Sequence, residues 1–116
     1  ENLDVTGLLP EETEVESIGL GFLSHHRSGI VFPESIELFT GPDLEHLTLK
    51  DTLHLPCAPC AREIARQDFV FPVNETLRCF RLMAHRYAKM PQWCAYKGVP
   101  DVFTMADTLL VKPKQA

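Results

Sequence analysis

The sequence has no apolar run that approaches the roughly 20 residues needed to span a bilayer, which excludes a transmembrane helix. It also has no excess of basic residues, because 11 lysines and arginines stand against 16 acidic residues, for a net charge of −5. A nucleic-acid-binding domain usually carries a basic surface, so we expect no nucleic-acid partner. The sequence does not lack hydrophobic residues, because they make up 45% of the chain, and this content excludes a disordered tail.

Proline, in contrast, is frequent, and its distribution predicts the fold class. Nine prolines are spread over 116 residues and leave little room for long helices. The length fits one compact domain, so we expect residues 1–116 to form a single unit. Strand-like segments separated by turn signals at short intervals then predict an all-β protein, an antiparallel β-sandwich.

Alternation of apolar with polar or small residues gives the expected strands and the expected core. The residues whose apolar faces should be buried together are Ile18, Leu20, Phe22, Ile36, Leu38, Phe80, Leu82 and Leu109. The strand that contains Phe69 is expected to stop at Asn74 and Glu75, with a separate strand over Leu77–Tyr87.

Cys57-Ala-Pro-Cys60 is the most conspicuous short motif. A structural zinc site usually needs a second pair of ligands, and the remaining cysteines, Cys79 and Cys94, are 15 residues apart and form no such pair. A redox site needs the motif at the start of a helix after a strand, and no such pattern surrounds it. We therefore interpret Cys57 and Cys60 as structural thiols that could form a local disulfide, and we expect no metal and no cofactor. A small zinc or redox domain is the less favoured alternative.

Trp93 and Tyr96 lie in a predicted loop that contains proline and glycine. Flat aromatic side chains in loops can stack on sugar rings, which makes these two residues the candidate carbohydrate-binding site. The alternative is that Trp93 packs against the end of the sandwich or against another domain, and we favour packing because a lone tryptophan is often buried.

Several segments together resemble one family of domains. Leu77-Arg-Cys-Phe-Arg-Leu-Met-Ala-His-Arg-Tyr-Ala-Lys-Met-Pro-Gln-Trp93 is similar to the penultimate-strand region of discoidin-like (coagulation factor 5/8 type C) domains. Within it, Met90-Pro91-Gln92-Trp93 matches an "LPxW" motif, and Met105–Val111 matches a closing "FxDEIxV" motif. Ile18–Phe22 followed by Gly29–Leu38 is similar to a "GIYxPxxIEVxxS" segment. The version with these motifs stands at the C-terminus of bacterial β-N-acetylhexosaminidases of glycoside hydrolase family 20, the chitobiases.

The resemblance covers nearly the whole chain but has departures. Gly98 matches one of the family's glycines, and Phe103 stands near its second tryptophan. Cys94 replaces the histidine that usually follows the first tryptophan, and the segment Pro56–Cys60 has no counterpart. The N-terminal loops that often bind calcium and ligand in such domains are also missing, so ligand and metal binding do not carry over.

The resemblance implies a discoidin-like, galactose-binding-like jelly roll that is truncated at its N-terminus. It implies a C-terminal fragment of a multidomain enzyme that removes terminal N-acetylhexosamines and is exported to the periplasm, the outer-membrane surface or the medium. The catalytic carboxylates would lie in a preceding barrel domain, so this segment would not be an enzyme itself. It would pack on the catalytic domain or help to place N-acetylglucosamine-containing substrates. An autonomous carbohydrate-binding module is the alternative.

Overall fold

The described residues form five strands, most of them from segments in which apolar residues alternate with polar or small ones. The computed structural model describes residues 3–24, 30, 32–55, 65–85 and 104–114. The strands are β1 (Leu3–Ser24), β2 (Ser35–Gly41), β3 (Thr48–His54), β4 (Ala65–His85) and β5 (Met105–Pro113). They form one antiparallel sheet in the order β3-β2-β4-β1-β5. The described part of the chain contains no helix long and apolar enough to cross a membrane.

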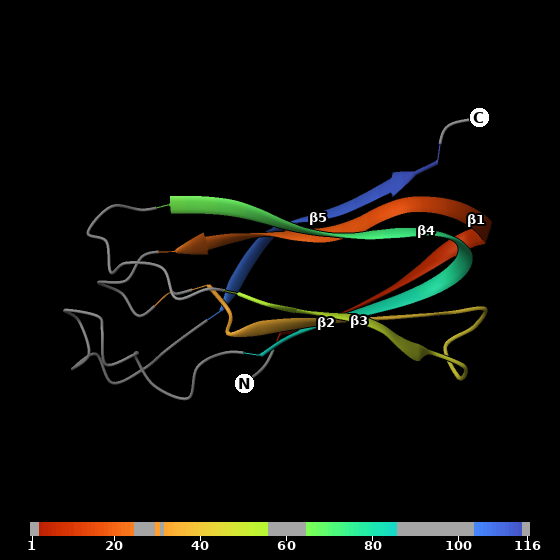
Figure 1. Cartoon of the computed structure of the whole chain (residues 1–116), viewed down its shortest axis with the longest axis horizontal. Helices are drawn as coiled ribbons and strands as arrows, with labels where there is room; N and C mark the ends of the chain where they lie inside the picture. The colour runs from red at the N-terminus through yellow and green to blue at the C-terminus, as the bar shows by residue number, and fades with distance from the viewer. Residues whose placement is uncertain (1–2, 25–29, 31, 56–64, 86–103, 115–116) are drawn as a thin grey trace.

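The sheet is folded over on itself because β1 and β4 bend together. Residues 15–24 of β1 pair with residues 65–75 of β4, and β5 extends this part of the sheet, which we call layer A. Residues 3–8 of β1 pair with residues 79–84 of β4, and β2 and β3 extend this part, which we call layer B. Figure 1 shows the two layers facing each other, with the bends of β1 and β4 at one end. The predicted antiparallel β-sandwich is confirmed.

Residues that interrupt ordinary strands make the bend. The pairing of β1 with β4 shifts between Leu8 and Thr13, and the residues left over in β1 include Pro10. On β4, Asn74 has a φ of 50°, in the left-handed region that asparagine tolerates better than most residues. The expectation that a strand stops at Asn74 is therefore wrong, because the chain bends there and continues in the sheet.

The core lies between the two layers and contains seven of the eight predicted residues. Those buried to 2% exposure or less are Ile18, Leu20, Phe22, Ile36, Leu38, Phe80 and Leu82. Leu109 is the exception, since 46% of it is exposed. Leu109 pairs with Leu20 and so lies on the same face of the sheet. However, β5 lies at the edge of the sheet that the described strands form, so among them only β1 shields this side chain from one side.

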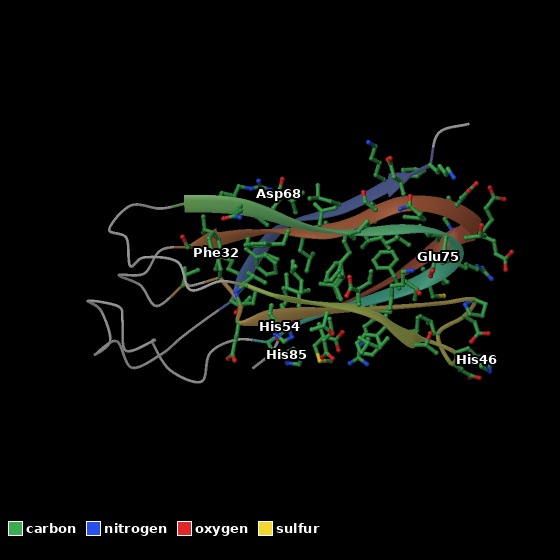
Figure 2. All side chains as sticks on the ribbon, in the orientation of Figure 1. Phe32, His46, His54, Asp68, Glu75 and His85 are labelled. Carbon is green, nitrogen blue, oxygen red and sulfur yellow. The ribbon has the colours of Figure 1, made fainter. Side chains whose placement is uncertain are left out.

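Glu75 connects the bend of β4 to layer B. Thr40 Oγ1 on β2 donates a 2.7 Å hydrogen bond to Glu75 Oε1, and Lys50 Nζ on β3 lies 3.0 Å from Oε2. Figure 2 shows Glu75 at the bent end of the molecule. Partial burial raises the pKa of Glu75, but the hydrogen bonds from Thr40 and Lys50 and the charge of Lys50 outweigh it, so this pKa lies below its ordinary value.

Candidate docking groove

The four site residues predicted from the sequence lie outside the described residues. They are Trp93, Tyr96, Cys57 and Cys60, so their stacking, packing or bridging stays a prediction. Cys79 is described, and it is a free thiol buried in β4. No group of three or more histidines, cysteines or carboxylates that could hold a metal ion occurs within the described ranges.

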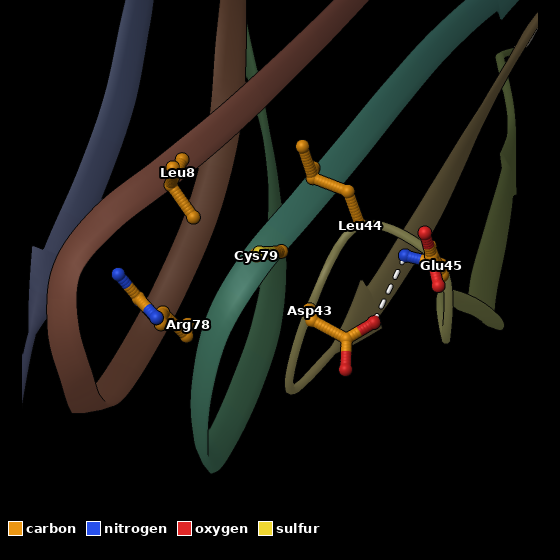
Figure 3. A pocket seen from close by; sticks show the side chains of 6 residues that line it. All are labelled: Leu8, Asp43, Leu44, Glu45, Arg78 and Cys79. Atoms are coloured by element: carbon orange, nitrogen blue, oxygen red, sulfur yellow. Dashed lines mark hydrogen bonds between the residues drawn. The ribbon is translucent and has the colours of Figure 1, made fainter.

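A hollow of about 370 Å³ lies on the outer side of layer B. Its lining residues come from β1, from β4 and from the turn between β2 and β3, and they are Leu8, Asp43, Leu44, Glu45, Arg78 and Cys79. Figure 3 shows Cys79 between Leu8 on one side and Leu44 on the other, with Asp43 and Glu45 along the turn. We call this hollow the Leu8–Leu44 groove.

Leu8, Leu44 and Cys79 form the apolar part of the groove, and Asp43, Glu45 and Arg78 line the rest of it. Leu8 and Cys79 are partners in the register of β1 and β4, so their side chains lie on the same face of the sheet. Cys79 is fully buried, whereas Leu8 is 58% exposed and Leu44 is 52% exposed. A single exposed leucine is ordinary on a protein surface, and here two of them stand around one hollow.

Hydrogen bonds within the turn hold the Leu44 wall in place. Asp43 Oδ1 accepts a 2.9 Å hydrogen bond from the Glu45 backbone N–H and shares a 2.7 Å hydrogen bond with His46 Nδ1. The hydrogen bond with the His46 side chain is the main reason that the pKa of Asp43 lies below its ordinary value. The Asp43 carboxylate therefore fixes the conformation of the turn through its hydrogen bonds with Glu45 and His46, and Leu44 in this turn is exposed to solvent.

Arg78 differs from every other basic side chain that the structure describes. The others each form an ion pair with a carboxylate: Lys50 with Glu75, Arg66 with Asp68 and Asp107, Arg81 with Asp4, Lys112 with Glu16, and Lys114 with Glu14. Arg78 has no carboxylate partner among the described residues. Its Nε donates a 3.3 Å hydrogen bond to the Leu9 backbone oxygen, which leaves Nη1 and Nη2 without a described partner.

A second hollow, of about 400 Å³, lies over layer A and has a different character. It is lined by Glu16, Ser17, Val70, Pro72, Asn74 and Lys112. Lys112 Nζ lies 3.0 Å from Glu16 Oε2, so the charges of this hollow already satisfy each other. Of these two hollows, the Leu8–Leu44 groove is the one lined by an arginine, Arg78, that has no carboxylate partner among the described residues.

Elsewhere on the sheet two further carboxylates, those of Asp4 and Asp107, join strands. Asp4 on β1 accepts a 2.9 Å hydrogen bond from Arg81 Nε on β4, and this bond is the main cause of its lowered pKa. Asp107 on β5 accepts hydrogen bonds from Arg66 and Thr108, which likewise lower its pKa. These groups are fixed as anions in structural pairs.

No motif in the sequence marks the groove, because its residues come from three distant segments. One signal was present in the adjacent pair Leu8-Leu9: neighbours in a strand point to opposite faces, so one of the two leucines had to face away from the core. The chain matches no protein-family model, and no curated protein matches it. The described part of the chain is an all-β sandwich with a groove on its outer face.

Proposed function

We propose that this chain is a non-catalytic accessory domain of an exported β-N-acetylhexosaminidase and that it acts by contacts with the catalytic domain. The observation that supports a non-catalytic role best is that four of the described carboxylates are engaged in hydrogen bonds that hold the turn and the strands together. A general acid needs a carboxyl pKa raised toward the working pH. The pKa values of Asp4, Asp43, Glu75 and Asp107 are instead all lowered, because hydrogen bonds within the protein hold these groups as anions.

The groove supports a role in protein contacts. Two half-exposed leucines beside a buried thiol make a surface that gains from being covered by another protein. The choice of a hexosaminidase as the parent rests on the resemblance of Leu77–Trp93 and Met105–Val111 to the closing motifs of the chitobiase domains. The all-β sandwich agrees with that resemblance.

The alternative functions depend on residues outside the described ranges. A carbohydrate-binding module would use Trp93 and Tyr96, and a zinc or redox domain would use Cys57 and Cys60. No contact of the described residues favours either alternative over the accessory role.

Hydrolysis of an aryl N-acetyl-β-glucosaminide tests the non-catalytic assignment. We expect the purified chain to release no more of the aryl alcohol than a buffer blank does, over a range of pH. A Glu75→Gln variant prepared in parallel separates contamination from activity, since a contaminant would act equally in both preparations. Turnover that persists through rigorous purification and changes with the variant would contradict the proposal.

A further inference from the structure

We propose that the Leu8–Leu44 groove binds an acidic and apolar peptide segment of a partner domain. In this arrangement a large apolar side chain of the partner lies over Cys79 between the two leucines, and a nearby carboxylate of the partner pairs with Arg78. The inference rests on the accessory role proposed above and names the surface and the partner chemistry through which that role is carried out.

The apolar part of the proposed partner follows from the lining of the groove. Leu8 and Leu44 are each more than half exposed, whereas Cys79 at the floor is fully buried, so the two leucines are the apolar surface that a partner meets. An aliphatic or aromatic side chain that enters between the leucines removes apolar surface of both proteins from water, which favours binding. The anchored Asp43 turn holds Leu44 in place beforehand, so little order has to be created on binding.

The acidic part follows from Arg78. Its Nε is held by the Leu9 backbone oxygen, and this contact orients the guanidinium plane at the edge of the groove. The terminal nitrogens Nη1 and Nη2 remain available as two parallel donors, an arrangement that matches a carboxylate. All other described lysines and arginines already have a carboxylate of this chain, so the missing partner at Arg78 fits an anion from another protein.

Other ligands fit the groove less well. A sugar usually stacks on an aromatic ring, and none of the six lining residues is aromatic. A polyanion such as a nucleic acid needs several cations, and Arg78 is the one basic residue that lines the groove. A free inorganic anion would gain nothing from the two leucines. A peptide that combines an apolar and an acidic side chain uses the two leucines and Arg78, and its carboxylate lies on the Arg78 side of Cys79, opposite Asp43 and Glu45 of the turn (Figure 3).

Short blocked peptides test the inference with the full chain. In an extended peptide the first and third side chains point to the same side, so the probe is acetyl-Leu-Ala-Glu-amide, with Gln and Lys replacing Glu in two comparison peptides. The measurement is the change in backbone amide shifts of the ¹⁵N-labelled chain during titration. We expect saturating shifts at Leu8, Leu44 and Cys79 at millimolar Kd, with the Glu peptide binding at least about threefold more tightly than the Gln peptide and the Lys peptide weakest.

Two variants establish the role of Arg78. Arg78→Gln removes the charge at an exposed position, and we expect it to abolish the preference for the Glu peptide over the Gln peptide. Lys112→Gln is the matched control, because it removes an exposed positive charge from layer A and should leave that preference intact. Unchanged amide spectra away from each substitution confirm that both variants are folded.

Three results would overturn the inference. The first is that the Glu peptide changes the amide shifts of residues outside the groove instead of those that line it. The second is that Arg78→Gln still binds the Glu peptide more tightly than the Gln peptide. The third is that the amide shifts of the groove change with protein concentration alone, which would assign the groove to a second copy of this chain. Each of these outcomes is compatible with an absence of hydrolysis, so the inference can fail while the accessory role stands.

Discussion

Arg66 on β4 and Asp107 on β5 form an ion pair across the strand that separates them. Arg66 Nε lies 2.7 Å from Asp107 Oδ2, and the pair passes over Gly21 of β1. A Cβ atom on Gly21 would lie 2.3 Å from Arg66 Nη2. The absence of a side chain at Gly21 therefore leaves the space in which three strands of layer A are joined by charged groups.

Gly19 and Gly21 of β1 are expected to respond differently to substitution. A Cβ at Gly19 would lie 2.4 Å from the Phe69 backbone oxygen, so Gly19→Ala has to displace backbone and should cost about 1–3 kcal/mol. Gly21→Ala meets the ends of flexible side chains, which can move, so its loss of stability should be smaller. Urea unfolding of both variants measures the difference. Equal losses would contradict the account of the close approach at Gly19.

Phe22 is expected to be a main contributor to stability. It is fully buried between the layers, so Phe22→Ala should lower the free energy of unfolding by about 3–5 kcal/mol. Leu49→Ala is the control, because Leu49 is 54% exposed and its loss should cost less than about 0.5 kcal/mol. Denaturant midpoints at neutral pH give both values. A Phe22→Ala variant as stable as Leu49→Ala would show that the layers do not share this core.

Glu75 should make stability depend on pH in acid. Its pKa in the folded chain lies below the ordinary value of 4.5, so its contribution is present above that pH and is lost as the pH falls through the folded pKa. Glu75→Gln should therefore be less stable than the wild type at neutral pH, with a difference that shrinks as the pH falls below about 4.5. Thermal midpoints between neutral and strongly acidic pH measure this trend, with exposed Glu12→Gln as the control. A difference that stays constant over that range would contradict the link from Glu75 to Thr40 and Lys50.

Trp93 is expected to be a packing residue rather than a sugar platform. If it packs against the end of the sandwich, Trp93→Ala should lower the free energy of unfolding by roughly 3–5 kcal/mol. An exposed tryptophan would instead leave stability within about 0.5 kcal/mol of the wild type. Denaturant unfolding of both proteins decides between these values, and an unchanged midpoint would contradict the packing interpretation.

Alternation in the sequence was sufficient to predict the core because it depends only on neighbouring residues. Ile18, Leu20 and Phe22 follow period two, and a strand that is half buried has to place them on one side. Leu109 follows the same pattern, but alternation does not show which strand will lie at the edge of the sheet. Its exposure follows from the order of the described strands, among which β1 is the one neighbour of β5.

The bend and the groove could not be predicted because both depend on distant contacts. Asn74 is typical of a turn, and the sequence does not show that Glu75 beside it is held by Thr40 and Lys50 while the chain continues in the sheet. The groove needs Leu8 next to Leu44, which are brought together by the pairing of β1 with β4 and of β4 with β2.

The most direct test of the central claim, that this domain acts through protein contacts and not by binding glycans, is a titration of the ¹⁵N-labelled chain with N-acetylglucosamine oligomers. We expect no saturable change in the backbone amide shifts at millimolar oligomer, including the amides of Trp93 and Tyr96. Saturable shifts at Trp93 and Tyr96 that disappear in Trp93→Ala would contradict this account and assign the chain to the carbohydrate-binding modules.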